Sequence, residues 1–404
     1  MLYFQEPAIF RTILEPYTKL VFGQYFNTGL LLIFGLIFSL LFYFIPKKFK
    51  LKVLLTASII FALISSTIAN FALFITILAI LFLCSNYDFK FKNILFWITE
   101  AFLLISTMLF NRAFKFHSAF YSFAAYYTMY RSIHYFVDVE QGSLKKAKFA
   151  DYITFLLFFP SFSHGPVERL ENLSPETITK EHIFFGFKRI FFGAAKFTFL
   201  LYVLSKIPVV SFSAGNFWNW LVYSAYGNAI RLYVLLSGDI DIVIGISSLI
   251  GFKISENFPK FPYIQESPTK FWQNWQATIV NWLTAYVYFP LCRNRKYIYL
   301  KTMVIIMIIG WAHLFYYFQD FPSIDYILYY TLWGVFLGGT LAASKVIEKK
   351  KADSKKSVQE KYPTLSKVVY ADNMFTKALN IFITFNIIAI GWLSPLYILI
   401  TKLR

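Results

Sequence analysis

The residues best suited to chemistry are Gly310-Trp311-Ala312-His313, which place an imidazole inside the apolar run 303–318. The chain has only five histidines in 404 residues. Because ionisable side chains are costly in lipid unless a helix bundle or a water-filled cavity satisfies them, such a histidine marks a candidate functional site. A histidine can also act simply as a polar contact between helices. From the residues alone, both interpretations stay open.

A second stretch, residues 267–291, is rich in Trp, Asn and Tyr. Ser267 followed by Pro268 is typical of a helix start, with proline at the first helical position. Helical spacing places three polar side chains on one face: Asn274, Thr278 and Asn281. An adjacent stripe consists of Trp272, Trp275, Ile279 and Trp282. Periodicity alone favours an interfacial helix that belongs to an aromatic belt.

Apolar helices must position these residues, since 58% of the chain is hydrophobic. The candidate membrane spans, some of them short or tilted, are residues 26–45, 51–84, 94–110, 183–204, 217–236, 303–318, 326–343 and 381–400. Weaker runs lie at residues 120–137, 153–162 and 240–252. Together they predict an all-α polytopic membrane protein with about 10–12 transmembrane or re-entrant helices.

The organisation along the chain indicates one integral membrane domain over residues 1–404. Residues 51–84 are too many for one ordinary span, and Asn70 near their middle is the expected site of a turn between two short helices. Residues 1–22 lack the basic region and cleavage site of a signal peptide, and we expect them to form an amphipathic lead-in on the membrane surface.

The net charge of +18 could suit nucleic acid, but the Lys and Arg residues lie in short loops between apolar runs. The positive-inside rule predicts that such loops face the cytoplasm, so membrane lipid and no nucleic acid is the expected partner. Residues 47–50, 293–296 and 345–367 are then cytoplasmic, and the last is expected to be a flexible loop. His313 would lie near the middle of the membrane, about 15 Å from Met303 in a core about 30 Å thick.

Other polar residues offer less chemistry. The two cysteines form no metal set or disulfide framework, and no zinc, nucleotide or serine-hydrolase motif is present, so we expect no metal and no bound cofactor. Asp239 and Asp241 would lie on nearly opposite faces of a helix and are not a paired acid/base site. We expect Asp241 to pair with Arg231 or Lys196, and Asp239 to be solvated.

Several motifs in order resemble one known family. FPSFSHGPVER at residues 159–169 is similar to FPxxxxGPIxR, and SGDIDIVIG at residues 237–245 is similar to SGYSDIAIG. HYFVDV at residues 134–139, ENF at residues 256–258, and FWxxWxxxxxxWLxxYVYxPL followed by GWAH complete the pattern. Over residues 120–345 the chain resembles the membrane-bound O-acyltransferase (MBOAT) superfamily. The similarity is greatest to the bacterial branch of alginate and peptidoglycan O-acetyltransferases and of the teichoic-acid D-alanyl transferase.

The resemblance implies a ring of helices around a central tunnel that meets His313, the expected catalytic base. Ala312 separates Trp311 from His313, and Leu314 replaces the family's glycine. Gln276 stands where bacterial members commonly have a histidine, and glutamine can orient a substrate but cannot take its proton. The expected substrate-binding residues are Gln276, Trp272, Trp275, Asn274, Asn281, Asp241, Ser237, Trp311 and Arg169.

The resemblance also implies a reaction. A small acyl group, acetyl or D-alanyl, would pass from a cytoplasmic thioester to a hydroxyl of an extracytoplasmic cell-envelope polysaccharide or polymer. The donor would be acetyl-CoA or an acyl carrier protein at the basic cytoplasmic face, and an extracytoplasmic acyltransferase or acceptor would be a partner. The protein would be a multi-pass protein of a bacterial cytoplasmic (inner) membrane. Two alternatives stay open: a transporter or flippase with an intramembrane proton relay, and a lipid or protein O-acyltransferase.

Overall fold

The computed structural model describes residues 29–65, 68–114, 119–200, 202–203, 206, 216–294, 296–317, 324–361 and 373–392. The predicted all-α class is confirmed: in these residues every named element is helical, and one isolated bridge joins Pro175 and Phe252. The chain divides into two compact units, which we describe separately. Unit 1 comprises residues 1–203, 233–257 and 315–321, and unit 2 comprises residues 204–232, 258–314 and 322–404.

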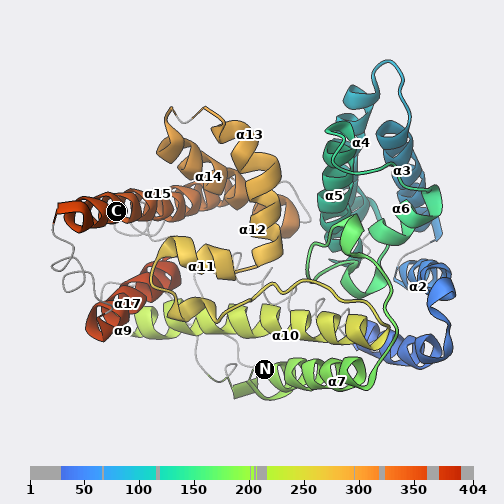
Figure 1. Ribbon diagram of the computed structural model, residues 1–404, viewed down its shortest axis with the longest axis horizontal. Coiled ribbons are helices and arrows are strands. Elements are labelled where there is room, and N and C mark those ends of the chain that lie inside the picture. Colours follow the sequence, from blue (N-terminus) through green and yellow to red (C-terminus); the bar gives the residue numbers. More distant parts are fainter. Residues whose placement is uncertain are drawn as a thin grey trace. The chain divides into compact units, whose positions relative to one another are not determined.

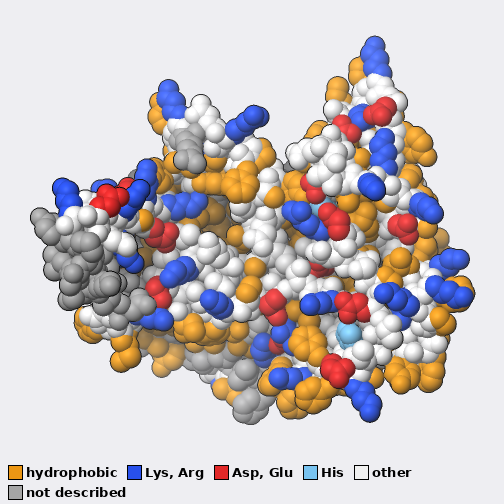
Figure 2. Space-filling view, in the orientation of Figure 1, with side chains coloured by type: hydrophobic (Ala, Val, Ile, Leu, Met, Phe, Trp, Pro, Cys, Tyr) orange, Lys and Arg blue, Asp and Glu red, His pale blue; other side chains and the backbone are white. Residues whose placement is uncertain are grey.

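The membrane character is also confirmed. Four described helices are long and apolar enough to cross a membrane: Ile68–Asn86, Gly227–Leu249, Ile327–Lys361 and Met374–Gly391. Many large hydrophobic side chains lie on the outside, such as Leu40 at 70% and Phe184 at 73% exposure, and Figure 2 shows hydrophobic side chains across the visible surface. Such exposure is expected where lipid replaces water as the solvent. The total number of spans, the tunnel and the single domain stay predictions.

Unit 1 is built mainly from α-helices, and the first that the structure describes is Gly29–Phe44 (Figure 1). The labelled α-helices that follow are α2 (Lys50–Ile64), α3 (Ile68–Asn86), α4 (Lys92–Phe114), α5 (Ala119–Glu140), α6 (Phe149–Leu156), α7 (Lys180–Ala195) and most of α10 (Gly227–Leu249). The expected break within residues 51–84 is confirmed, but it falls after Ile64 and not at Asn70, which lies in the first turn of α3. The Ser65 hydroxyl bonds back to the Phe61 carbonyl at 2.6 Å, a contact that competes with continued helix.

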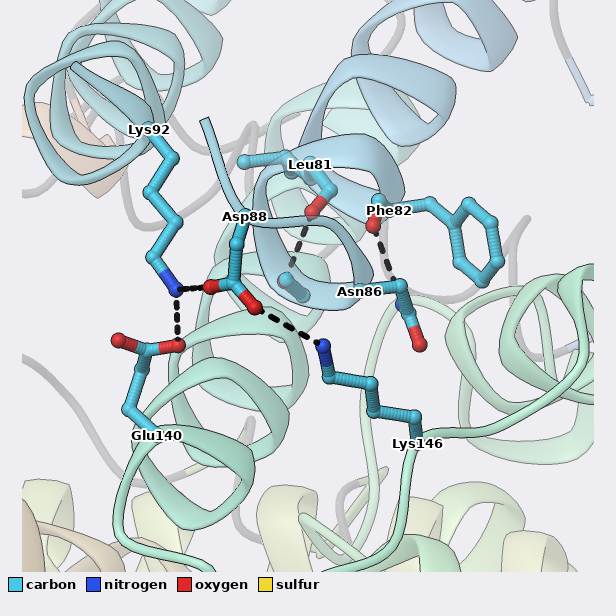
Figure 3. Close-up of polar contacts among 8 residues, drawn as sticks. Leu81, Phe82, Asn86, Asp88, Lys92, Glu140 and Lys146 are labelled. Atoms are coloured by element: carbon cyan, nitrogen blue, oxygen red, sulfur yellow. Dashed lines mark hydrogen bonds and ion pairs between the residues drawn. The ribbon is translucent and has the colours of Figure 1, made fainter. Parts of the chain in front are cut away.

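Ion pairs join one end of α4 to its neighbours in unit 1 (Figure 3). The Lys92 Nζ atom lies 2.7 Å from an Asp88 carboxylate oxygen and 2.6 Å from one of Glu140, while Lys146 lies 3.6 Å from Asp88. The hydrogen bond from Lys92 and the charges of both lysines lower the pKa of the exposed Asp88 carboxyl. The end of α5 and the start of α4 are therefore held together at one end of the bundle.

Helices α7 and α10 approach closely within unit 1 because glycines lie between them. A Cβ added at Gly193 would lie 2.6 Å from Ile242 Cγ1 and 2.7 Å from the Gly238 carbonyl oxygen. Small residues at helix interfaces are typical of membrane proteins, where backbone contact replaces the hydrophobic driving force. The two predicted runs 217–236 and 240–252 are not separate helices. Instead α9 (Phe217–Asn219) and a π-helix, η6 (Trp220–Tyr226), lead into the continuous α10.

Unit 2 contains the tryptophan-rich stretch and the histidine-bearing helix (Figure 1). Its main elements are α11 (Pro268–Asn274), α12 (Ala277–Leu283), the π-helix η8 (Thr284–Tyr288), α13 (Phe289–Cys292), α14 (Ile298–Tyr317), α15 (Ile324–Lys361) and α17 (Met374–Gly391). The predicted start of α11 is confirmed: the Ser267 hydroxyl accepts a hydrogen bond from the Lys270 backbone N–H at 3.3 Å, and Pro268 is the first helical residue.

Helix α15 corrects the prediction of a flexible loop at residues 345–367. The helix continues to Lys361, and residues 362–367 lie outside the described part of the chain. Residues 345–361 contain no Gly or Pro and are rich in Lys, and Lys, Glu, Gln and Ala are all good helix formers. The Ser344 hydroxyl also donates to the Glu348 carboxylate at 3.1 Å. Helix propensity therefore outweighed the polarity on which the loop prediction rested.

Candidate functional site

Gln276 lies at a sharp break between α11 and α12. Trp275 is extended, and Gln276 has φ 47° and ψ 49°, in the left-handed region. The Gln276 carbonyl then accepts hydrogen bonds from Ile279 at 2.9 Å and Val280 at 3.1 Å, which start α12. Left-handed backbone is unfavourable for a residue with a Cβ and is often found at functional sites. The prediction of one continuous helix through this stretch is wrong.

A tryptophan cluster offsets the strain at Gln276. We give this name to Trp272, Trp275, Trp333 and Trp392 of unit 2. Trp275 is 4% exposed, its ring stacks on Phe271 at 5.4 Å between centroids, and it lies 5.4 Å from the Trp392 ring. Aromatic pairs contribute about 0.5–1.5 kcal/mol each, and Trp275 makes at least these two, which together match the roughly 1–2 kcal/mol cost of a left-handed residue. Tertiary packing thus overrides helical periodicity.

The break separates the polar residues that periodicity placed on one face. The Asn274 amide donates to the Lys270 carbonyl at 2.9 Å within α11. Asn281 lies on α12, beyond the break, and its side chain is exposed. Because the helix is interrupted at Gln276, the predicted polar stripe of Asn274, Thr278 and Asn281 does not form.

Helix α14 carries Trp311 and His313, as predicted. His313 lies about one turn before the helix ends at Tyr317. The side chains of both residues lie outside what the structure describes. The backbone below them is fixed by close packing, since a Cβ at Gly310 would lie 2.9 Å from the Tyr330 carbonyl oxygen on α15. The depth of His313 in the membrane stays a prediction.

In unit 1, the loop at residues 159–169 is held by a buried arginine. Arg131 is fully buried, and its guanidinium donates to the Leu156 carbonyl at 3.1 Å and to the carbonyl and hydroxyl oxygens of Ser161 at 2.6 Å each. The Gly165 carbonyl accepts from Tyr127 at 2.9 Å and from Asn257 at 3.1 Å. Two stretches of the family pattern, GPxxR and ENF, therefore meet at this loop.

Arg131 was missed from the sequence, although a signal was present. It is the single charged residue within the apolar run 120–136, and a lone charge in such a run requires buried partners. These partners are mainly backbone carbonyls, which no sequence motif identifies. Arg131 acts by fixing the loop.

Asp241 forms an ion-pair network between α10 and α7. Its two oxygens lie 2.5 Å from Lys196 Nζ and 2.8 Å from an Arg189 nitrogen, and Arg189 also lies 2.8 Å from Glu256. The predicted pairing with Lys196 is confirmed, whereas Arg189 was missed and Arg231 instead donates to Asn228 at 2.9 Å. This network makes Asp241 a packing residue of unit 1.

The other predicted residues of α10 are also inside the unit. Ser237 is 4% exposed, and its hydroxyl lies 3.5 Å from the Val234 carbonyl of the same helix. Asp239 is 1% exposed, so the expectation that it is solvated is wrong. Helix α10 buries both faces against neighbouring parts of unit 1, and therefore an aspartate on either face is removed from solvent.

Arg169 belongs to a second polar group of unit 1. Its guanidinium lies 3.9 Å from Asp138, the His134 Nδ1 atom lies 3.0 Å from the same carboxylate, and His134 Nε2 lies 3.6 Å from Glu171. One ligand atom each from His134, Asp138 and Glu171 lie within 4.8 Å of one another, a spacing that could hold a metal ion. The Arg169 guanidinium already supplies a positive charge there, so a structural ion-pair group explains the geometry without a metal.

His164 is the second notable histidine. Its Nδ1 atom lies 2.8 Å from the Ser163 hydroxyl, and its buried Nε2 atom has no hydrogen-bond partner among the described residues. Burial lowers the pKa of His164 to about 4, so the ring is neutral near pH 7. Its place beside Gly165 in the FPxxxxGPxxR stretch makes it a polar group available to a ligand.

The comparisons with known proteins agree with the motif pattern. The chain is 30% identical over 231 residues to a probable alginate O-acetylase of Pseudomonas fluorescens, a match that covers 54% of this chain and 44% of the relative. It is 25% identical over 296 residues to a teichoic acid D-alanyltransferase of Streptococcus thermophilus, covering 66% of each. It is 26% identical over 178 residues to a peptidoglycan O-acetyltransferase of Helicobacter pylori, covering 40% of this chain and 33% of that protein.

These matches share one chemical theme, the transfer of an acyl group to a cell-envelope polymer. The chain matches less than half the length of the alginate O-acetylases. No family model matches it. The theme nevertheless agrees with the ordered motifs, and the chain is similar in sequence to bacterial proteins named for O-acetyl and D-alanyl transfer.

Proposed function

We propose that this protein is an O-acyltransferase of the bacterial cytoplasmic membrane. It moves a small acyl group, acetyl or D-alanyl, from a cytoplasmic thioester to a hydroxyl of an extracytoplasmic cell-envelope polymer. The observation that carries the proposal is the position of His313 within the apolar helix α14, in a chain whose relatives are named for acyl transfer. An ionisable residue in such a helix requires a functional reason or a buried partner.

The reaction needs one base. The acceptor hydroxyl oxygen attacks the thioester carbonyl carbon while the His313 imidazole takes the hydroxyl proton. The new C–O bond forms, the C–S bond breaks, and the imidazolium returns the proton to the leaving thiolate. General-base assistance of this kind is worth about 10²–10⁴-fold in rate. The thioester is already activated, so no metal is needed to polarise it.

Gln276 supports this assignment as a substrate-orienting residue. Its left-handed backbone turns the chain between two helices, and its amide can both donate and accept a hydrogen bond. Because an amide cannot act as a base, His313 is the sole proton acceptor that we assign. Trp272 and Trp275 precede Gln276 in the chain and would line the acyl group.

The donor would dock at the basic segment 293–301. Arg293 and Lys296 are exposed, whereas Lys301 donates to the Leu291 and Asn294 carbonyls at 2.9 Å each and stabilises the segment. Acyl carrier proteins are usually acidic, so charge would steer such a donor to this surface. If the donor KM does not rise with salt, charge steering of the donor is excluded. An extracytoplasmic partner would receive or pass on the acyl group.

The test uses purified wild-type protein and the His313→Ala variant, each incubated with radiolabelled acetyl-CoA and with charged acyl carrier protein. We expect the wild type to consume one thioester and transfer the label, and the variant to lose about 10²–10⁴-fold in rate. His182→Asn is the matched control, because the His182 ring caps α7 through Thr179 and pairs with Glu176 at 2.9 Å, both in unit 1, and has no role in the proposed transfer. Full transfer by His313→Ala would overturn the assignment. No consumption by wild type with partner fractions present would favour the transporter interpretation.

A further inference from the structure

Two unpaired hydrogen-bond donors lie together in the tryptophan cluster. The Nε1 atoms of Trp272 and Trp392 are both buried, and neither has a hydrogen-bond partner among the described residues. The two rings are 6.0 Å apart between centroids and inclined at 70°. An unmade hydrogen bond is costly for a buried donor, so two such donors in one cluster require an explanation.

The chemistry of indole restricts what could satisfy them. The Nε1–H group of tryptophan donates a hydrogen bond and cannot accept one. The missing group must therefore be an acceptor such as a carbonyl oxygen, and a protonated amine is excluded. Gln276 directly follows Trp275, a member of the tryptophan cluster. The cluster that contains the two donors therefore adjoins the position where the chain departs from regular helix.

The surrounding contacts hold both rings in place. Trp392 lies 5.4 Å from Trp275 and 6.0 Å from Trp333 between ring centroids, and its carbonyl accepts a hydrogen bond from Tyr329 at 3.0 Å. Trp272 is on α11, whose first turn is capped by Ser267. Helices α11 and α17, the latter ending next to Trp392, are neighbours in unit 2. Donors fixed in this way require little reorganisation when charge develops nearby.

We propose that the indole N–H groups of Trp272 and Trp392 bind the carbonyl oxygen of the acyl group being transferred. This inference rests on the proposed acyl transfer. When the acceptor hydroxyl attacks, the C=O electron pair moves onto this oxygen, and the two N–H groups stabilise the oxyanion until the C–S bond breaks and the C=O bond re-forms. Trp392 thereby joins the site from outside the region of family resemblance.

Kinetics of Trp→Phe variants test the proposal. Trp272→Phe and Trp392→Phe each remove one donor and keep an aromatic ring, and we expect kcat to fall about 10²-fold with little change in KM. Trp333→Phe is the matched control, since Trp333 belongs to the same cluster and is 4% exposed, but its Nε1 is not one of the unpaired donors. An equal fall in all three variants would show that only ring packing matters, and unchanged kcat in Trp392→Phe would overturn the proposal.

Binding supplies a readout that needs no turnover. Acetonyl-dethio-CoA, in which a CH₂ group replaces the thioester sulfur, keeps the carbonyl but cannot transfer its acyl group. We expect it to shift the indole N–H resonances of Trp272 and Trp392, assigned from the variants, and to leave that of Trp333 unchanged. Transfer by wild type without these shifts would refute the oxyanion contact alone. Shifts without transfer would refute the proposed function and retain the carbonyl site, and the absence of both would refute both.

Discussion

In unit 1, charged and polar contacts fix the loop at residues 159–169, with Arg131 and Tyr127 at its centre. In unit 2, packed rings fix the segment around Gln276. Some buried polar atoms of unit 1 lack a hydrogen-bond partner among the described residues, such as Arg131 Nε and Arg189 Nε, but the other nitrogens of these two guanidinium groups are bonded. In the tryptophan cluster of unit 2, the indole N–H is the one polar group of each tryptophan side chain, and those of Trp272 and Trp392 have no partner among the described residues, close in sequence to the left-handed Gln276.

This difference indicates that unit 1 mainly supports the structure and that unit 2 carries the groups that take part in the reaction. A satisfied buried network makes a region rigid and specific, which suits a scaffold. Unpaired buried donors and strained backbone are costly to stability and persist where a ligand or reaction uses them. Unit 1 is therefore expected to respond to mutation mainly through stability, and unit 2 through activity. Variants in each unit test this division.

The largest effect is expected for Arg131→Met in unit 1. Methionine fills much of the volume but leaves the Leu156 carbonyl and both Ser161 oxygens buried without their donor, which should lower the free energy of unfolding by about 3–5 kcal/mol. Thermal unfolding in detergent measures this loss. Arg169→Met is the control, because that side chain is 51% exposed and should cost under about 1 kcal/mol. Equal losses would contradict the scaffold role of Arg131.

In unit 2, Trp275→Leu should lower the free energy of unfolding by about 2–4 kcal/mol, more than the other variants of that unit. Leucine removes the stacking on Phe271 and Trp392 and leaves a cavity. The left-handed Gln276 would then lose its support, so transfer should fall more than stability alone explains. Trp218→Leu is the control at 72% exposure. If Trp275→Leu changed stability without reducing the activity of the folded fraction, unit 2 would resemble unit 1.

Gly165→Ala should destabilise unit 1 by about 2 kcal/mol. Gly165 has φ 107°, and an added Cβ would lie 2.7 Å from a Val243 methyl group, so strain and overpacking add. Gly142→Ala measures the cost of backbone strain alone. Gly142 also has a positive φ, 71°, but no atom lies within 4 Å of an added Cβ. Denaturation midpoints compare the two. A cost for Gly142→Ala as large as for Gly165→Ala would show that packing contributes nothing.

The sequence predicted most helices of both units and the wrong backbone at Gln276. Apolar runs predicted the helices because lipid-facing and core-facing residues are both hydrophobic. The start of α11 was predictable because Ser267 and Pro268 are a local signal that does not depend on tertiary contacts. The break at Gln276 depends on where Trp275 packs. That contact involves Trp392, more than a hundred residues away, so periodicity within one helix could not reveal it.

The site residues divide in the same way. His313 and Gln276 came from motif positions, and Asp241 with Lys196 came from charge pairing along the chain. Arg189, Arg131 and Trp392 were missed because their partners are backbone carbonyls or distant side chains. The loop prediction at residues 345–361 failed for the opposite reason, since polarity was weighted above the helix propensity of Lys, Glu and Ala.

Gln276→Gly separates stability from activity in unit 2. Glycine adopts left-handed backbone without strain, so relief of that strain should raise the free energy of unfolding by up to about 1 kcal/mol. The loss of the amide should nevertheless lower transfer. Gln276→Asn is the paired variant, since asparagine tolerates the same backbone and keeps an amide. Activity in Gln276→Gly equal to wild type would show that only the turn is needed.

The smallest effect concerns His164 of unit 1, whose buried Nε2 atom, like the two indole N–H groups of unit 2, has no hydrogen-bond partner among the described residues. Burial lowers its pKa to about 4, whereas an unfolded histidine has a pKa of about 6.5. Between these values the unfolded chain binds a proton that the folded protein does not. The stability contributed by the neutral ring is therefore complete above pH about 6.5 and is lost as the pH falls toward about 4.

Replacing the ring should remove this dependence. Melting temperatures of the wild type should fall as the pH drops through that window, and His164→Gln should fall less steeply. Ser163→Ala keeps the buried ring while it removes the contact to Nδ1, so its acid sensitivity should stay like that of the wild type. If His164→Gln and wild type had the same slope, His164 would already share a proton with a ligand or solvent in the folded state. Its unpaired nitrogen would then be part of a site, and the division between the two units would be less sharp than their contacts indicate.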